Sequence, residues 1–183
     1  MGSKDFGHSG NDRFAGSRQF ADYGIQIAYF RCHHCSLIFT NAFDAWTPDD
    51  FKAHIYNADY GLADPPFERE RPMRNAQMVA GLWHADKTDL TFLDVGGGAG
   101  AMAHYLRDLG VACESSDPFY GGAASSSSFD VVTCFEVLEH VSPPAQKSYL
   151  KAISAQLSPR GTVLLSTTIL DRDVTVDHWY ICP

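Results

Sequence analysis

The chain has 183 residues, a formal net charge of -8 and a pI near 5.3. Apolar residues make up 45% of it and charged residues 20%, which is the composition of a folded globular protein and excludes a disordered chain. The acidic balance disfavours nucleic acid as a partner, because binding to phosphate backbones is driven by basic surfaces. The sequence contains neither a run of about 18 apolar residues nor a signal peptide, so it predicts a cytoplasmic protein without a membrane span.

The first part of the chain predicts a small appendage built around a cysteine pair. Residues 1–24 show no helical or strand period, so we expect a loop there. Two short apolar runs at 25–31 and 37–39 predict strands, and Cys32 and Cys35 lie in the turn between them. The spacing of this pair is that of a zinc knuckle, although zinc takes four ligands and the sequence offers one such pair. A redox role for the two thiols is the alternative.

Two helices are expected next. Pro48 is followed by two aspartates, which suits a helix start because acidic residues are favoured at the positive end of the helix dipole. This helix should end near Gly61. The segment 67–84 predicts an amphipathic helix in which Pro72 lies near the start or at a kink, since proline inside a helix removes a backbone hydrogen bond.

The remaining residues, 63–183, are expected to form an α/β domain that is separate from the appendage at 1–62. Strands alternate with helices in this part, with strands at 91–95, 111–115, 129–135 and 162–167 and helices at 101–109 and 145–157. Such alternation implies crossover connections and a Rossmann-like parallel sheet flanked by helices. The serines at 125–128 predict a flexible loop.

The loop after the first of these strands is rich in glycine. It reads Asp94-x-Gly96-x-Gly98-x-Gly100, and glycine lets the backbone approach a ligand closely. The pattern predicts a nucleoside-bearing cofactor, but it also satisfies the dinucleotide fingerprint and so leaves a nicotinamide oxidoreductase open. Asp117 follows the second strand, where a carboxylate accepts hydrogen bonds from ribose hydroxyls, or stabilises a turn before a proline.

The segment after the third strand distinguishes the two cofactor classes. Residues 129–141 read Phe-Asp-Val-Val-Thr-Cys-Phe-Glu-Val-Leu-Glu-His-Val. Together with the segment 93–100, they resemble two motifs of the class I S-adenosylmethionine-dependent methyltransferases, in the same order. The resemblance runs from about residue 91 to 168. It implies S-adenosylmethionine as the cofactor and methylation of an oxygen or carbon on a small-molecule acceptor.

The resemblance also assigns roles to individual residues. The amino-acid and sulfonium end of the cofactor would lie against Asp94, Gly96, Gly98 and Gly100. Asp117 would hold the ribose, and Phe135 and Glu136 would pass close to the adenosine or the methyl group. The candidates for contact with the acceptor are Tyr60 and His178.

Glu136, Glu139 and His140 fall within five residues. A helical turn after the strand would bring them to one face. The pattern resembles that of small-RNA 2′-O-methyltransferases and quinone-pathway O-methyltransferases, where it binds a divalent metal, but relatives that bind none share the same letters. Three roles stay open: a divalent-metal site, acid–base catalysis or acceptor orientation by His140 with Glu139, and a structural role.

Two features depart from the family pattern. Residues 29–40 resemble the second half of a zinc ribbon that precedes some sugar C-methyltransferases, yet the earlier cysteine pair of that ribbon has no counterpart here. Only 11 residues separate Asp117 from Phe129, and the sheet has fewer strands than the family carries. We therefore expect a C-terminally incomplete methyltransferase core. The alternative to an enzyme is a degenerate or truncated fold that acts as a non-catalytic interaction module.

Overall fold

The computed structural model describes residues 1–83, 89–121 and 128–182, so most of the expected serine loop at 125–128 lies outside the described residues. The chain forms two compact units. One combines Met1–Phe67 with the C-terminal segment from Ile169, and the other is Glu68–Thr168. The division near residue 67 lies close to the boundary expected from the sequence. The last segment packs with the first unit, although the sequence places it in the main domain.

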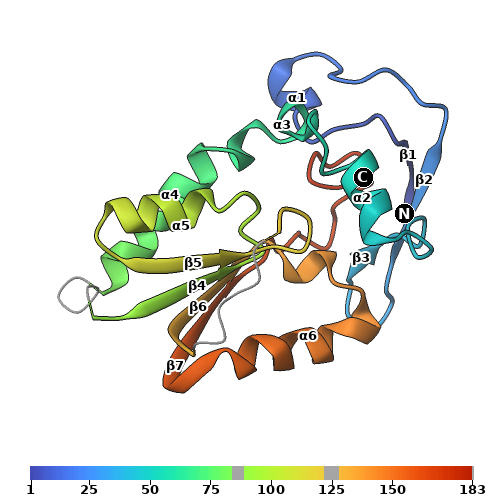
Figure 1. Cartoon of the computed structure of the whole chain (residues 1–183). Coiled ribbons are helices and arrows are strands. Elements are labelled where there is room, and N and C mark those ends of the chain that lie inside the picture. Colours follow the sequence, from blue (N-terminus) through green and yellow to red (C-terminus); the bar gives the residue numbers. More distant parts are fainter. Residues whose placement is uncertain (84–88, 122–127, 183) are drawn as a thin grey trace. The chain divides into compact units, whose positions relative to one another are not determined.

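The second unit is a parallel sheet with helices on both faces (Figure 1). Its strands lie in the order β5 (Ala112–Ser116), β4 (Thr91–Val95), β6 (Phe129–Phe135) and β7 (Leu157–Ser166). All three neighbouring pairs are parallel, with Leu93 opposite Val132 and Thr133 opposite Leu164. The predicted parallel sheet flanked by helices is therefore confirmed.

Side-chain alternation along the strands supplies the two halves of this core. Phe92 and Val131 pack on one face with α4 (Glu70–Leu82) and α5 (Ala101–Asp108). Leu93 and Val132 pack on the other face with α6 (Pro143–Ala155). Because both faces are covered, β6 is apolar and buried along most of its length, as parallel strands in α/β proteins are.

The first unit is built on a three-stranded antiparallel sheet in the order β1 (Gly2–Asp5), β2 (Gln26–Arg31) and β3 (Ile38–Phe39). Ile27 and Tyr29 are buried together with Ile181 of the C-terminal segment. The prediction of a loop over residues 1–24 is wrong for β1, which pairs with β2 along its whole length. Its Gly-Ser-Lys-Asp sequence has no strand propensity, so the pairing comes from the tertiary context.

Short helices complete the first unit, namely α1 (Asp12–Ala15), α2 (Pro48–His54), α3 (Tyr60–Ala63) and a 3-10 turn at Pro65–Phe67. The predicted helix from Pro48 begins correctly, with a Thr47–Asp50 capping box, but it ends at His54 rather than near Gly61. The Asn57 amide donates to the Ala53 carbonyl, and the Asn57 side-chain oxygen accepts from the Asp59 N–H. Such local bonds compete with helix continuation. Among the described residues, no helix is long and apolar enough to cross a membrane.

Candidate cofactor site

The glycine-rich loop lies at the carboxyl end of β4 and leads into α5. Asp117 follows the neighbouring strand β5, so the two segments meet at the same edge of the sheet. The Gly96 N–H donates to the Ser116 carbonyl (2.8 Å), and the Gly98 N–H donates to Asp117 Oδ2 (2.9 Å). Crevices outside the carboxyl ends of parallel strands are where open α/β sheets bind their ligands.

The three glycines singled out by the sequence share a left-handed backbone. Their φ angles are +75° at Gly96, +57° at Gly98 and +81° at Gly100, a region that side chains disfavour. A Cβ built on Gly96 would also lie 2.4 Å from Val137 Cγ2, so the loop packs directly against the segment that follows β6. The glycine pattern is therefore required by both conformation and packing.

Gly97 is a further site residue that the sequence did not single out. A Cβ at this position would lie 2.3 Å from Asp94 Oδ2 and 2.5 Å from Ser115 Oγ. The Ser115 hydroxyl is buried, and it has no hydrogen-bond partner within the described ranges of the chain. A buried polar group without a partner is costly, so this hydroxyl suits a ligand at the loop. The glycine-rich loop and the Ser115 hydroxyl without a partner together fit a bound nucleoside cofactor.

Asp94 is buried directly beneath the loop, with 4% of its surface exposed. Its Oδ1 accepts a hydrogen bond of 2.9 Å from the Thr133 hydroxyl of β6. Burial raises the pKa of Asp94 to about 6; the Thr133 hydrogen bond opposes this rise and the negative charge of Asp117 adds to it. A cationic ligand group at the loop would be attracted to this carboxylate and would favour its ionised form.

The Asp117 carboxylate accepts hydrogen bonds from the glycine-rich loop and from the turn that follows β5. Its Oδ2 accepts from Gly98, while its Oδ1 accepts from the backbone N–H groups of Phe119 (2.8 Å) and Tyr120 (3.2 Å). An ionised carboxylate offers about four lone-pair positions, of which these bonds use three. A pair of ribose hydroxyls can therefore bind Asp117 only if at least one backbone bond is shared or replaced.

Glu136 holds the end of β6 against the end of β7. Its φ is +55°, which is strained for a residue with a side chain. The carboxylate accepts from the Ser166 hydroxyl (2.9 Å) and the Thr168 hydroxyl (2.8 Å), and the Glu136 N–H donates to the Ser166 carbonyl. Phe135 is half-buried and packs against the α4–α5 side of the core. Strain of this kind is concentrated at functional sites.

Glu139 and His140 follow in the 3-10 turn Leu138–His140, and both are exposed. No group of three or more His, Cys, Asp or Glu side chains is placed to hold a metal ion in the parts of the chain that the structure describes. The Glu136 oxygens already accept two hydroxyl bonds. The arrangement therefore does not assemble the divalent-metal site that the sequence left open at these three residues.

The two predicted acceptor contacts belong to the first unit. Tyr60 lies in α3, with its ring 5.1 Å from that of Tyr56 and 4.8 Å from that of Phe67 between centroids. His178 lies in the C-terminal segment, where its Nδ1 accepts from the Tyr180 N–H (3.3 Å). Contact of either residue with an acceptor stays a prediction.

Cys32 and Cys35 are free thiols in the turn between β2 and β3. Hydrogen bonds to the Cys32 sulfur from the backbone N–H groups of Cys35 and His34, together with the Cys35 thiol, hold the pKa of Cys32 below its usual range. The donor set suits two of the four positions of a zinc site. The described residues bring no third ligand of the kind zinc prefers to this pair.

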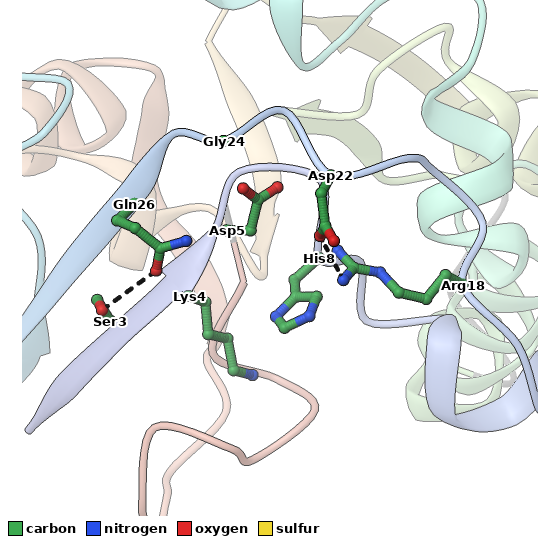
Figure 2. Close-up of a pocket in the computed structure, with 8 residues that line it drawn as sticks. All are labelled: Ser3, Lys4, Asp5, His8, Arg18, Asp22, Gly24 and Gln26. Atoms are coloured by element: carbon green, nitrogen blue, oxygen red, sulfur yellow. Dashed lines mark hydrogen bonds and ion pairs between the residues drawn. The ribbon is translucent and has the colours of Figure 1, made fainter.

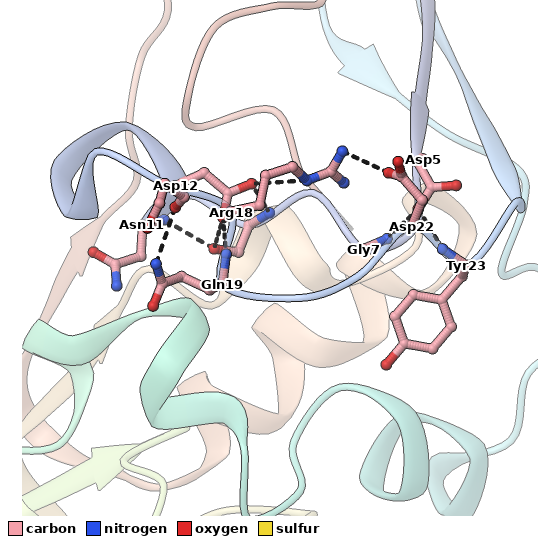
Figure 3. Close-up of polar contacts among 10 residues, drawn as sticks. Asp5, Gly7, Asn11, Asp12, Arg18, Gln19, Asp22 and Tyr23 are labelled. Carbon is pink, nitrogen blue, oxygen red and sulfur yellow. Dashed lines mark hydrogen bonds and ion pairs between the residues drawn. The ribbon is translucent and has the colours of Figure 1, made fainter.

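The first unit also contains a charged pocket of about 400 Å³ at one end of β1 and β2 (Figure 2), lined by Ser3, Lys4, Asp5, His8, Arg18, Asp22, Gly24 and Gln26. Figure 3 shows that several of these charges already have partners. Arg18 forms an ion pair with Asp22 at 2.5 Å, and buried Asp5 accepts from the N–H groups of Gly7 and Tyr23. These contacts hold the 5–23 segment in place, which accounts for the cluster structurally.

Comparisons with known proteins agree with this geometry. The family described as "Methyltransferase domain" matches residues 67–181. The mitochondrial ubiquinone biosynthesis O-methyltransferase of Schizosaccharomyces pombe is 41% identical over 58 residues, which are 30% of this chain and 20% of that protein. The ubiquinone biosynthesis O-methyltransferase of Parvibaculum lavamentivorans is 29% identical over 104 residues, which are 43% of this chain and 40% of that protein. The chain thus spans less than half the length of these curated relatives.

A solved structure shows the same fold. It is the Burkholderia thailandensis 1,6-didemethyltoxoflavin-N1-methyltransferase with bound 1,6-didemethyltoxoflavin and S-adenosylhomocysteine. It matches 80% of this chain and 70% of its own at a TM-score of 0.50 and 21% identity. The family match covers more than half of the chain, including the sheet and the glycine-rich loop. The chain belongs to the class I S-adenosylmethionine-dependent methyltransferases.

Proposed function

We propose that the chain transfers the methyl group of S-adenosylmethionine to an oxygen or carbon of a small-molecule acceptor. The observation that carries this proposal is the hydrogen bond from the Gly98 N–H to Asp117 Oδ2, because it joins the glycine-rich loop to the expected ribose-binding acid. The relatives named above, whose names describe methylation of small molecules, support an acceptor of this class. A net charge of -8 also favours it over nucleic acid.

In this proposal the loop binds the cofactor through backbone groups. Gly96, Gly98 and Gly100 leave room for the amino-acid end, with Asp94 below them as the anionic partner. Asp117 binds the ribose, and Phe135 and Glu136 border the adenosine. When bound, S-adenosylmethionine supplies a methyl group on a positively charged sulfur, which a positioned nucleophile can take without a covalent intermediate on the protein.

Calorimetric titration with S-adenosylhomocysteine tests cofactor binding directly. We expect saturable binding with one site per chain, and no displacement by excess NADH. Absence of binding to the folded chain would contradict the proposal, and displacement by NADH would favour the nicotinamide class. Binding without methyl transfer to any acceptor tested would favour the non-catalytic alternative.

Replacing Asp117 by alanine should weaken S-adenosylhomocysteine binding by about 1–3 kcal/mol, or roughly 5- to 150-fold in dissociation constant. The variant loses the bonds to ribose and the Gly98 anchor of the loop. Calorimetry on the two proteins measures the difference. Asp108→Ala, an exposed acid at the end of α5, is the matched control and should bind as the unsubstituted chain does. Equal affinities for all three proteins would exclude ribose binding by Asp117.

His140 is the proposed general base, with Glu139 orienting it. It lies in the 3-10 turn after β6, and desolvation lowers the pKa of His140 against the opposing charges of Glu139 and Glu136, so its imidazole is neutral at pH 7 and can accept a proton. We expect His140→Gln to lower the rate of methyl transfer by about 10²- to 10⁴-fold, the usual contribution of a positioned base. Affinity for S-adenosylhomocysteine should stay within about twofold, since His140 is not assigned to the cofactor.

The measurement follows S-adenosylhomocysteine release with a panel of phenolic and sugar acceptors, and Glu139→Gln provides the comparison variant. An unchanged rate of methyl transfer in the His140→Gln variant would show that His140 is not the general base. A divalent metal is tested in the same assay, because activity that survives EDTA and Glu139→Ala would exclude it.

A further inference from the structure

Three polar side chains form a row across the sheet beneath the glycine-rich loop. Ser115 of β5 and Thr133 of β6 are the register partners of Asp94 in β4, one on each side of it. The residue two positions before each of them belongs to the core that packs with α4 and α5, so alternation places the three polar side chains on that same face of the sheet. The row therefore lies where the core of this face ends and the cofactor loop begins.

Thr133 and Ser115 differ in how they meet the Asp94 carboxylate. The Thr133 hydroxyl donates to Asp94 Oδ1 at 2.9 Å, whereas the buried Ser115 hydroxyl has no hydrogen-bond partner among the residues that the structure describes. Asp94 Oδ2 and Ser115 Oγ converge beside Gly97, because a Cβ built there would lie 2.3 Å from the first and 2.5 Å from the second. A serine hydroxyl turns about its own C–O bond and can donate, so the Ser115 hydroxyl can be directed at Asp94 Oδ2.

The ionised form of Asp94 needs more than one such donor. The side chain is buried, and burial raises the pKa of Asp94 to about 6 although Thr133 donates to it. A buried carboxylate becomes charged readily only when hydrogen bonds and an opposite charge replace the water that it has lost. In the proposed complex the opposite charge is the ammonium group at the amino-acid end of the cofactor. Ser115 is the hydroxyl of the row that remains for a second hydrogen bond.

The other groups around Asp94 do not supply that stabilisation. Asp117, after β5, is negatively charged and disfavours the ionised form of Asp94. Cys113 of β5 and Cys134 of β6 interact electrostatically with Asp94, but burial raises the pKa of both thiols, which are therefore uncharged at neutral pH. The helices α4 and α5 contribute apolar side chains to this face of the sheet. The ion pairs among the described residues do not include Asp94.

We propose that Ser115 is a positioning residue for the cofactor: its hydroxyl donates to Asp94 Oδ2 when the carboxylate faces the cofactor ammonium, while Thr133 donates to Oδ1. The role of Ser115 rests on the proposed binding of S-adenosylmethionine at the glycine-rich loop. Where Asp94 is protonated in the free chain, its proton leaves to solvent as the ammonium binds, and no covalent bond of the cofactor changes. Ser115 then contributes to the cofactor-bound chain rather than to the stability of the ligand-free chain, in which its hydroxyl is unpartnered.

Calorimetric titration with S-adenosylhomocysteine compares the full unsubstituted chain with Ser115→Ala at pH 5, 6, 7 and 8. We expect Ser115→Ala to weaken binding by about tenfold at pH 8, the usual effect of losing one hydrogen bond to a charged group. The difference should narrow as the pH falls below 6, because Asp94 becomes protonated and a protonated carboxyl does not depend on the Ser115 donor. Ser154→Ala, which removes an exposed hydroxyl from α6 of the same unit, is the matched control and should bind as the unsubstituted chain does at every pH.

Two further measurements separate positioning of the cofactor from a merely structural role. Thermal unfolding of ligand-free Ser115→Ala should be unchanged or should occur at a higher temperature, because the substitution removes a buried hydroxyl without a partner. Titration of the unsubstituted chain in buffers of different ionisation enthalpy should show roughly one proton released per S-adenosylhomocysteine bound at pH 5 and almost none at pH 8. 5′-Methylthioadenosine, which has the adenosine but no ammonium group, should bind without proton release and equally to both chains.

The outcomes distinguish this role of Ser115 from the proposed function. Binding of S-adenosylhomocysteine that is equal in Ser115→Ala and the unsubstituted chain, or that releases no proton at pH 5, would overturn the role of Ser115 and leave the proposed function in place. A parallel loss of thermal stability and of affinity for both ligands would show that Ser115 is a structural residue only. Absence of binding of either ligand to the unsubstituted chain would overturn the proposed function as well.

Discussion

Replacing Gly97 by alanine is expected to reduce affinity for S-adenosylhomocysteine more than tenfold and to destabilise the second unit by about 1–3 kcal/mol, the usual cost of overpacking. The added methyl group would lie 2.3 Å from Asp94 Oδ2 and 2.5 Å from Ser115 Oγ. Neither of these two oxygen atoms can move away from the added methyl group easily. The Asp94 carboxylate is held by Thr133 and buried, and Ser115 belongs to β5. The loop must therefore move outward, into the space proposed for the cofactor.

Calorimetry and thermal unfolding measure the two effects of Gly97→Ala. Gly10→Ala is a suitable control, because the nearest atom to its added Cβ is 3.4 Å away and its backbone is not left-handed. It lies in the first unit and should leave cofactor affinity unchanged. If Gly97→Ala bound S-adenosylhomocysteine as tightly as the control, the loop would not be the cofactor site.

Replacing Asp94 by asparagine is expected to stabilise the ligand-free chain at pH 8 by up to about 3 kcal/mol, while weakening cofactor binding. The pKa of Asp94 is about 6 in the folded chain against 3.8 for an ordinary aspartate. The folded state therefore binds more protons than the unfolded state between these values, and stability falls as pH rises from about 4 to 6. Above that range Asp94 is fully ionised, and the folded state carries the whole free-energy cost of burying its charge. Asparagine removes the charge, while its side-chain amide oxygen can still accept the hydrogen bond from Thr133.

Urea unfolding of both proteins at pH 4, 5, 6 and 8 measures this difference. The difference in free energy of unfolding between the variant and the unsubstituted chain should increase from pH 4 to pH 6 and stay constant above pH 6. Asp130→Asn is the contrasting control, because the Thr91 N–H and the hydroxyls of Ser158 and Thr91 hold the pKa of Asp130 below its usual range. That substitution should lower stability at neutral pH. An identical pH profile for Asp94→Asn and the unsubstituted chain would show that Asp94 is not a buried ionisable group.

The strands of the second unit were predictable because their apolar runs are short and bounded by glycine, proline or polar residues. β4 and β6 have the predicted bounds, and β5 is shifted by one residue. β7 begins at Leu157 rather than at residue 162, because Leu157 pairs with Phe129 ahead of an irregularity in the register. The sequence had assigned Leu157 to the preceding helix, and apolar periodicity cannot decide between the two at such a junction.

The site residues that the sequence indicated are the glycines that the backbone conformation requires and the two acids at the strand ends, Asp94 and Asp117. The left-handed backbone at Gly96, Gly98 and Gly100 explains why the spacing of these glycines was informative. Glycine is required at position 97 because a Cβ there would collide with Asp94 and Ser115, and contacts between residues so far apart in the chain cannot be recognised in the sequence.

The first unit is discontinuous along the chain, and this has a consequence for its biogenesis. The ammonium group of Lys4, in β1, donates to the carbonyls of His178 (2.9 Å) and Ile181 (2.7 Å). The buried cluster around Ile27 and Tyr29 likewise includes Ile181. Domains generally fold as units while the ribosome is still extending the chain, so Glu68–Thr168 can fold as soon as it emerges. The strand β1 must wait until residues 178–181 have been synthesised before its lysine can bind these carbonyl acceptors.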